Sequence, residues 1–327
     1  MTLPLYAAPM NYLSNCLYRH IVLSHGADFA FSELMRMDRV DRELENQKLR
    51  LFEEDLLRTI FQIGVGTKEE VDDAVVTIKE HVGLPKEINL NMGCPHSSMK
   101  KKKICGGILF DQELMHELSS RLVDDCKGII PSVKLRIGLD PQKIQIDEYL
   151  DVLHDAGIRK VYIHARSLRH PYARPATYGS LSEAKRQFPD MMLIFNGDID
   201  SWHAYQDIVD DFLCDGVMIG RTAIQNPLIF QQIKNKEKTY KGPFNPEQKD
   251  TSLVHYDGFT YLSKEKAAVI IELVDLCEKE GLPLEYIKSN LKELLKGITD
   301  KILLRALNID ISFDDVKALL HKMSDSW

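Results

Sequence analysis

A cysteine in a sharp turn is the strongest candidate for chemistry in this sequence of 327 residues. The segment Asn91-Met92-Gly93-Cys94-Pro95 follows an apolar run with the composition of a buried strand. A cysteine between glycine and proline lies exposed on a tight turn, which suits a proton donor or a nucleophile better than a core position. We therefore assign Cys94 as the candidate catalytic residue.

The six cysteines give no sign of a disulfide framework or of a zinc site, because they are scattered and include no Cys-x-x-Cys pair. We therefore expect no metal. Cys126, Cys214 and Cys277 stand among apolar neighbours, and we interpret them as buried core residues.

Two glycine turns indicate a phosphate-binding site. They are Phe195-Asn196-Gly197-Asp198 and Met218-Ile219-Gly220-Arg221, and each follows an apolar run. Glycine lets backbone N–H groups approach a phosphate closely, and Arg221 adds a charged fork. Either turn alone is typical of a tight strand-to-helix connection, but the pair on adjacent strands favours phosphate binding. No G-x-G-x-x-G motif follows a strand, which argues against a Rossmann dinucleotide site.

Three further polar residues, Gln62, Lys134 and His164, stand near the ends of apolar runs. A lysine in such surroundings is costly unless it meets an anion or a polar ligand. A reduced flavin offers negative charge at N1 and O2, which a nearby lysine stabilises. For His164, a satisfied core position and a cofactor contact are equally good interpretations.

Eight short apolar runs alternate with amphipathic stretches, which predicts a parallel sheet with right-handed crossovers. The runs cover residues 3–8, 28–32, 59–63, 87–91, 132–136, 160–165, 191–196 and 216–219. Eight such units within about 230 residues match a TIM (β/α)₈ barrel; a doubly wound open sheet is the competing architecture. The barrel is favoured because its strands all end on one face, where the polar strand-end residues would meet.

The pattern changes after Ile233, and the rest of the chain reads as helices only. Residues 234–249 are polar and contain Gly242, Pro243 and Pro246, as in a linker. Ile287, Leu291, Leu294 and Leu295 form one helical stripe, and Ser312-x-x-Asp315 resembles a capping box. We predict a barrel domain at residues 1–240 and a smaller all-helical domain at residues 243–327.

The composition is that of an ordinary globular protein, with 44% hydrophobic and 28% charged residues. No apolar run approaches the ~20 residues of a membrane span, and the start of the chain does not resemble a signal peptide. We expect a cytoplasmic protein, without membrane contact and monomeric. The net charge of −7 argues against a general polyanion binder but permits local basic patches.

An ordered set of motifs resembles the tRNA-dihydrouridine synthase family over residues 7–230. The set comprises Ala8-Pro9-Met10, Asn91-x-Gly93-Cys94-Pro95, Val133-Lys134-Leu135-Arg136-Ile137-Gly138, His164-x-Arg166, Asn196-Gly197-Asp198, Gly216-Val217-Met218-Ile219-Gly220-Arg221 and Asn226-Pro227-x-x-Phe230. Single motifs are weak signals, whereas their shared order is a strong one.

The resemblance implies an FMN enzyme that is reduced by NADPH or NADH and converts uridine in tRNA to 5,6-dihydrouridine. Hydride would pass from reduced FMN to C6, and Cys94 would protonate C5 from the other face, with the uridine flipped into the pocket. Asn91 and Arg166 would bind the substrate. The implied FMN contacts are Pro9, Met10, Asn11, Gln62, Lys134, His164, Asn196, Gly197, Asp198, Gly220 and Arg221.

The sequence departs from the family pattern at four positions. Tyr12, Cys105 and Ala165 stand where the family usually has glycine, and Asn89 stands where an acidic residue is common. Two alternatives remain open: an FMN barrel acting on a free pyrimidine, similar to dihydroorotate dehydrogenases, and a noncatalytic RNA-binding relative.

Two groups of lysines are candidates for contact with tRNA. The run at residues 100–103 follows the Cys94 turn, and a solvated surface is an equally good interpretation of it. Lys288, Lys292 and Lys296 recur at helical spacing, so they would share one face of a helix in the C-terminal domain.

Overall fold

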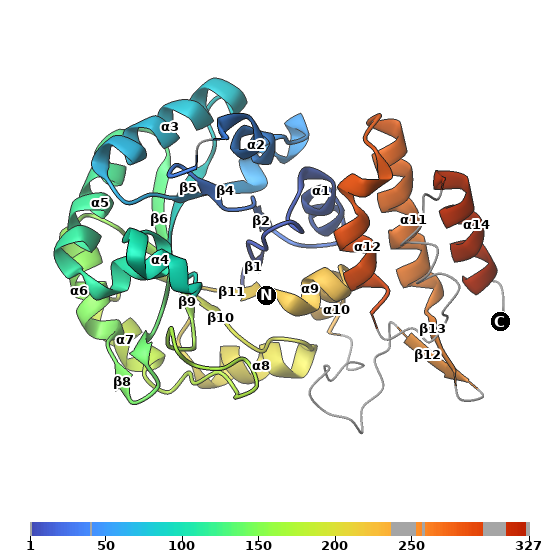
Figure 1. Ribbon diagram of the computed structural model, residues 1–327. Coiled ribbons are helices and arrows are strands. Elements are labelled where there is room, and N and C mark those ends of the chain that lie inside the picture. Colours follow the sequence, from blue (N-terminus) through green and yellow to red (C-terminus); the bar gives the residue numbers. More distant parts are fainter. Residues whose placement is uncertain (1, 40, 237–252, 257–258, 297–311, 325–327) are drawn as a thin grey trace.

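Eight parallel strands close into a barrel in the computed structural model, which describes residues 2–39, 41–236, 253–256, 259–296 and 312–324 (Figure 1). Each strand pairs with its neighbours along the chain, and β1 pairs with β11 to complete the ring. The strands are β1 (Leu5–Ala7), β2 (Phe29–Phe31), β4 (Thr59–Gly64), β5 (Glu87–Met92), β6 (Ile130–Arg136), β9 (Lys160–His164), β10 (Met192–Asn196) and β11 (Gly216–Ile219). The predicted TIM barrel is thus confirmed.

Helices surround the barrel, and the longer ones present one apolar face to the strands. In α3, for example, Val71, Ala74 and Ile78 are fully buried, and the Thr67 side chain caps the first turn. The helices are α1 (Cys16–Ser24), α2 (Arg42–Asn46), α3 (Lys68–Val82), α4 (Ser97–Lys102), α5 (Gln112–Asp125), α6 (Ile146–Asp155), α7 (Leu181–Gln187), α8 (Trp202–Asp211), α9 (Arg221–Gln225) and α10 (Ile229–Lys234). Short strands β3 (Met35–Arg36), β7 (Gly138–Asp140) and β8 (Lys143–Ile144) lie in the loops.

Aromatic rings and a buried ion pair fill the barrel at the end where the strands begin. Tyr6, Phe31 and Tyr162 pack edge to face in the interior. The Glu87 carboxylate accepts hydrogen bonds from Lys160 Nζ at 2.6 Å and from the Tyr162 hydroxyl at 2.8 Å. A satisfied buried pair of this kind is costly to break, since the remaining charge would lose its partner. Side chains thus fill the interior at the end where the strands begin. The polar residues of the candidate site lie at the opposite end, where the strands finish.

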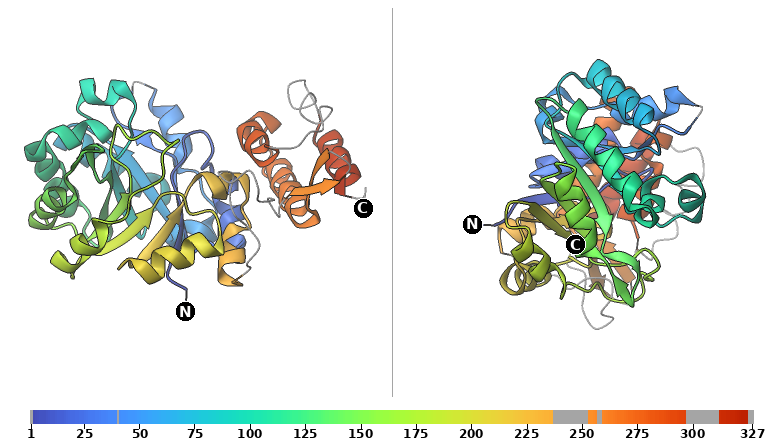
Figure 2. Two further views of the ribbon diagram at one scale, coloured as in Figure 1. Left: turned by 90° about the horizontal axis from the view of Figure 1, so that it is seen from below. Right: turned by 90° about the vertical axis from the view of Figure 1, so that its left-hand side faces the viewer.

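The C-terminal part has its own apolar cluster, to which the barrel contributes Cys16, Leu17 and Ile21 of α1. Figure 2 shows it as a smaller body beside the barrel. Its helices within the described residues are α11 (Lys264–Lys279), α12 (Lys288–Leu294) and α14 (Phe313–Ser324), with a 3₁₀ turn at Leu284–Tyr286. The sequence predicted helices only, whereas the structure adds an antiparallel hairpin of β12 (Leu253–Tyr256) and β13 (Phe259–Leu262).

Both local predictions for the C-terminal helices are confirmed. Ile287, Leu291, Leu294 and Leu295 are all buried, as the helical stripe requires. The Ser312 hydroxyl donates to the Asp315 carboxylate at 2.6 Å and accepts from the Asp315 N–H at 3.1 Å, at the start of α14. Most of the predicted linker lies outside the described residues, so the domain limits remain a prediction.

A buried pair of amide side chains joins the two parts. Asn15 caps α1 and donates from Nδ2 to Asn290 Oδ1 at 2.8 Å, and Asn290 Nδ2 donates to the Leu13 carbonyl oxygen at 2.7 Å. Gln225 Nε2 also donates to Glu293 at 3.2 Å. The C-terminal helices are thereby fixed against the loop that follows β1. Of the helices in the described ranges, none is long and apolar enough to cross a membrane.

Candidate active site

A chain of hydrogen-bonded polar side chains links the three adjacent strands β4, β5 and β6 on the inside of the barrel. Asn91 Nδ2 donates to Gln62 Oε1 at 2.8 Å, and Gln62 Nε2 donates to Asn89 Oδ1 at the same distance. Asn89 Nδ2 then donates to the Ser132 hydroxyl at 2.8 Å. Asn89, which replaces the acidic residue common in the family pattern, therefore has its donor and its acceptor satisfied inside the barrel.

The Cys94 turn is held by two side chains at the strand ends. Asn91 Oδ1 accepts hydrogen bonds from the N–H groups of Gly93 and Cys94 at 3.0 and 3.1 Å. Arg136, at the end of β6, donates from Nε to the Gly93 carbonyl oxygen at 2.9 Å. The turn is thus fixed from both sides, and Cys94 is half-buried at the mouth. Such fixed placement is what a proton donor needs.

The segment beyond the Cys94 turn folds back onto it as a 3₁₀ helix, Cys105–Phe110. A Cβ atom on Gly106 would lie 2.2 Å from the Cys94 carbonyl oxygen, so glycine is required at this contact. Cys105 itself is buried, and burial together with the nearby Cys94 raises the pKa of its thiol well above the usual value. The two cysteines are neighbours, and only Cys94 reaches the mouth.

Lys134 is a half-buried amine in the mouth. Its Nζ donates to Asn196 Oδ1 at 3.3 Å, and Asn196 Nδ2 donates to the Met218 carbonyl oxygen at 2.8 Å. Burial, and then the charge of Arg136, lower the pKa of Lys134 to about 7. An anionic ligand beside Nζ would reverse that shift, because it stabilises the ammonium form.

His164 is neutral at pH 7, since burial and the charges of Arg136, Lys134, Arg166 and Arg221 lower its pKa well below the usual value. Arg166 lies 3.3 Å from His164 Nε2 through NH1. A guanidinium can only donate, so Nε2 accepts and the imidazole proton sits on Nδ1. His164 therefore presents a neutral N–H donor rather than a charge.

Asp198 links the two glycine turns. Its carboxylate accepts from Arg166 NH2 at 2.5 Å, from Arg221 NH2 at 2.8 Å and from the Ala176 N–H at 2.8 Å. The preceding Gly197 has a φ of 138°, and a Cβ there would lie 2.9 Å from the Ala176 Cβ. Asp198 thus orients two arginines, and the cofactor contact that the sequence predicts for it stays a prediction.

An exposed tyrosine that the sequence did not single out lies among three arginines. The guanidinium carbons of Arg136, Arg166 and Arg221 lie 5.4, 5.6 and 5.1 Å from the centre of the Tyr172 ring. Tyr172 comes from the loop after β9, and its hydroxyl accepts from Arg136 NH2 at 2.9 Å. A loop residue such as Tyr172 leaves no periodic pattern in the sequence. Its position between the motifs at His164 and Asn196 could nevertheless have marked it as a candidate site residue.

The residues of the mouth fit a flavin phosphate and ring system in three respects. Lys134 is a half-buried amine with a lowered pKa, and its hydrogen bond goes to a neutral amide, that of Asn196. Gly220 has a φ of −108°, and a Cβ there would have only Ala8 within 4 Å, at 3.6 Å, so packing does not demand glycine. Its small size instead leaves room for a ligand beside the Arg221 fork. Pro9 and Met10 are half-buried at the same rim, next to the exposed Asn11.

The lysines at residues 100–103 are mostly engaged within the chain. Lys100 Nζ lies 4.2 Å from the Phe110 ring centre, Lys102 pairs with Asp38 at 2.6 Å, and Lys103 pairs with Asp111 at 3.0 Å. Within the described part of the chain, no three His, Cys, Asp or Glu side chains are grouped so that they could hold a metal ion.

Comparison with known proteins identifies the family of this chain. The family profile of dihydrouridine synthases, Dus, matches residues 6–316. The chain belongs to the dihydrouridine synthase family. A probable tRNA-dihydrouridine synthase of Aquifex aeolicus (strain VF5) is 30% identical over 303 residues, which cover 90% of this chain and 94% of the relative. tRNA-dihydrouridine synthase B of Escherichia coli (strain K12) is 27% identical over 233 residues, 71% of each chain.

Solved structures support the barrel fold of this family member. Morphinone reductase superposes with a TM-score of 0.51 at 12% identity, covering 72% of this chain and 86% of that one. A 2-naphthoyl-CoA reductase in complex with 2-naphthoyl-CoA gives a TM-score of 0.54 at 9% identity, covering 74% and 52%. At such identities the likeness concerns the fold alone.

Proposed function

We propose that this protein is an oxidoreductase that reduces uridine to 5,6-dihydrouridine in tRNA, with FMN as cofactor and NADPH or NADH as reductant. One observation carries the proposal: the chain is a dihydrouridine synthase family member whose Cys94 turn is fixed at the barrel mouth by Asn91 and Arg136. Both relatives described above bear the name of this activity.

The proposed flavin site lies across the strand ends from β1 to β11. Lys134 would stabilise the negative charge of the reduced ring, and His164 would donate from Nδ1. Gly220 and Arg221 would receive the phosphate, with Asp198 orienting the arginine. The remaining proposed contacts are Pro9, Met10, Asn11, Gln62, Asn196 and Gly197.

The proposed chemistry needs an acid opposite the flavin. Bound FMN, once reduced, supplies the hydride for C6 of the pyrimidine. Cys94 would deliver the proton to C5, and Asn91 would hold both the uracil edge and the N–H groups of the turn. Arg166, which Asp198 holds at 2.5 Å, would contribute a second substrate contact.

The C-terminal domain, residues 243–327, would grip the tRNA beside the barrel domain, residues 1–240. Lys288 is half-buried, whereas Lys292 and Lys296 are exposed. A monomer in the cytoplasm is the expected form. The alternative of a free pyrimidine substrate gains little support, because the family profile continues through the C-terminal helices to residue 316.

Two measurements on one preparation test the proposal. The purified protein should release FMN on denaturation, and it should convert uridine to dihydrouridine in unmodified tRNA when NADPH is supplied. A protein that binds FMN and reduces free uracil or orotate but not tRNA would establish the free-pyrimidine alternative. A protein that binds tRNA but no FMN would establish the noncatalytic one.

A further inference from the structure

Tyr12 combines an exposed ring with an unfavourable backbone conformation. Its φ is 62°, in the left-handed region that residues other than glycine rarely adopt. Its side chain is 68% exposed, so no burial of the ring compensates for that conformation. Strain of this kind persists where the surrounding structure imposes it, and it gathers at functional sites. The surroundings of Tyr12 show how it is imposed.

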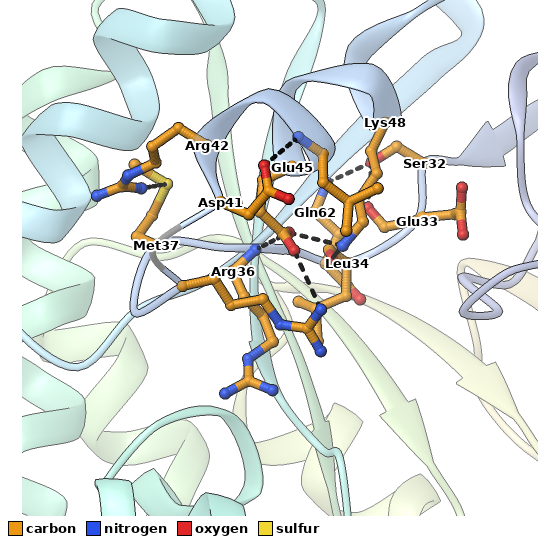
Figure 3. A network of polar contacts seen from close by, with 12 residues as sticks. Ser32, Glu33, Leu34, Arg36, Met37, Asp41, Arg42, Glu45, Lys48 and Gln62 are labelled. Carbon is orange, nitrogen blue, oxygen red and sulfur yellow. Dashed lines mark hydrogen bonds and ion pairs between the residues drawn. The ribbon is translucent and has the colours of Figure 1, made fainter.

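A carboxylate in the loop after β2 holds the Tyr12 backbone. The Tyr12 N–H donates to Glu33 Oε1 at 2.5 Å. The residues on both sides of Glu33 are held, because Ser32 Oγ accepts from the Gln62 N–H at 2.9 Å and the Leu34 carbonyl oxygen accepts from Lys48 at 2.8 Å. Figure 3 shows these anchors, with Lys48 also bound to a buried glutamate of α2. The clamp on Tyr12 is therefore part of the rigid barrel.

The C-terminal domain holds the same turn from the other side. The Leu13 carbonyl oxygen accepts from Asn290 Nδ2 at 2.7 Å, and the Ser14 N–H donates to the Met10 carbonyl oxygen at 2.9 Å. Tyr12 thus stands at the tip of a turn that both domains fix. The turn begins at Met10 and Asn11, two of the proposed flavin contacts.

We propose that Tyr12 is a stacking platform for a nucleobase of the tRNA that flanks the reacting uridine. The inference rests on the proposed function, since it concerns how that substrate is gripped. A uridine drawn into the barrel leaves its neighbours unstacked, and an exposed aromatic ring accepts the face of any base. Because the backbone is held in advance, little ordering is needed when RNA binds.

The position of Tyr12 favours RNA as the partner. The ring lies at the rim where the barrel mouth meets the C-terminal domain, one residue from the contact between Leu13 and Asn290. Lys288 and Lys292 flank Asn290 in the chain and lie on α12. An RNA backbone along α12 would bring its bases past Tyr12 toward Cys94.

Three substitutions test the platform. Tyr12→Gly and Tyr12→Asn both suit a left-handed residue and remove the ring, whereas Tyr12→Phe keeps the ring. The first two should raise the Kd and the KM for unmodified tRNA by about fivefold or more, because one stacking interaction is removed. They should also raise the melting temperature of the holoenzyme, because the strain is relieved. Tyr12→Phe should bind tRNA as the wild type does.

A matched control removes an exposed apolar side chain at the opposite end of the barrel. Leu84, which is 58% exposed and precedes β5, serves as Leu84→Ala, and tRNA affinity should not respond to it. Unchanged tRNA affinity in Tyr12→Gly and Tyr12→Asn would overturn the inference, as would a rise in the KM for NADPH in place of that for tRNA. If the wild type makes no dihydrouridine, the proposed function fails instead, and flavin content with tRNA binding separates the two results.

Discussion

Arg136 reaches from the end of β6 to the turn that carries Cys94, with its Nε 2.9 Å from the Gly93 carbonyl oxygen. The same guanidinium donates from NH1 to the Ser167 carbonyl oxygen at 3.0 Å and from NH2 to the Tyr172 hydroxyl. One side chain therefore joins the candidate acid to the loop after β9. Arg136 is a positioning residue, because it acts on the reaction through the Cys94 turn.

Replacing Arg136 by lysine should keep a positive charge but remove the fork that binds the loops after β5 and β9. We expect Arg136→Lys to lower kcat for dihydrouridine formation by about 10- to 100-fold, since a displacement of ~1 Å at a reacting group has effects of this size. FMN content should remain near one per chain. Arg169→Lys, on an exposed side chain 3.7 Å from Asp140, is the control. Wild-type kcat in Arg136→Lys would remove the positioning role.

Substitution of the two neighbouring cysteines separates the acid from a packing residue. Cys94→Ala should lower dihydrouridine formation by about 10²- to 10⁴-fold, as expected for a general acid, while flavin reduction by NADPH continues. Cys105 is buried, and its thiol pKa is raised by burial, so it should not donate a proton. Cys105→Ala should therefore retain kcat. Loss of product in Cys105→Ala but not in Cys94→Ala would reverse the assignment.

Cys105 and Tyr12 show what the family pattern could and could not reveal. Both stand where the family usually has glycine, and the structure gives them φ values of 49° and 62°. The family pattern marked both positions as departures, and the structure adds that both backbones are left-handed, whereas Ala165, the third such departure, is not among the residues with positive φ. The pattern could not show that Glu33 and Asn290 hold the turn at Tyr12, because contacts between loops and distant helices leave no periodic signal.

The strands of the barrel were predictable because each is a short apolar run, and every observed end lies within two residues of its prediction. The hairpin of the C-terminal part was missed although a signal existed. Asp257-Gly258 separates two β-rich runs, and this dipeptide is typical of two-residue hairpin turns.

The lowered pKa of Lys134 predicts a pH-dependent stability of the flavin-free protein. Because its pKa is about 7 in the folded protein and higher in the unfolded chain, the unfolded chain binds more protons between about pH 7 and 10.5. The destabilisation from burying Lys134 is therefore complete below pH 7 and declines as the pH rises. Relative to wild type, Lys134→Met should be more stable at pH 6, with the difference shrinking toward pH 10. Urea unfolding at both pH values measures it.

Lys134 should also make the affinity for reduced FMN depend on pH. Reduced FMN brings negative charge to Lys134 and favours its ammonium form, so binding at about pH 8 should take up a proton. The affinity for reduced FMN should fall as the pH rises from 7 to 9, and Lys134→Met should abolish this trend. An identical pH trend in wild type and variant would place the flavin charge away from Lys134.

Salt dependence tests whether the C-terminal lysines meet RNA phosphates. Lys288 and Lys292 lie on α12, whereas Lys296 follows the end of that helix and pairs with Glu293 at 3.4 Å. Phosphate contacts release counterions, so tRNA affinity should fall steeply with salt in the wild type. Replacing all three lysines by alanine should flatten the slope by roughly one unit for each lysine that binds a phosphate.

The ion pair of Lys296 predicts which single lysine substitution changes the salt dependence more. Both lysines are exposed, but the Lys296 ammonium has a carboxylate partner at 3.4 Å, whereas Lys292 forms no ion pair with the described residues. Lys292→Ala should therefore reduce the salt slope more than Lys296→Ala does, while FMN content stays unchanged in both. Lysines that are merely solvated would leave the slope of the triple variant equal to that of wild type. Titration of unmodified tRNA at several salt concentrations distinguishes these outcomes, and equal slopes would remove α12 from tRNA recognition.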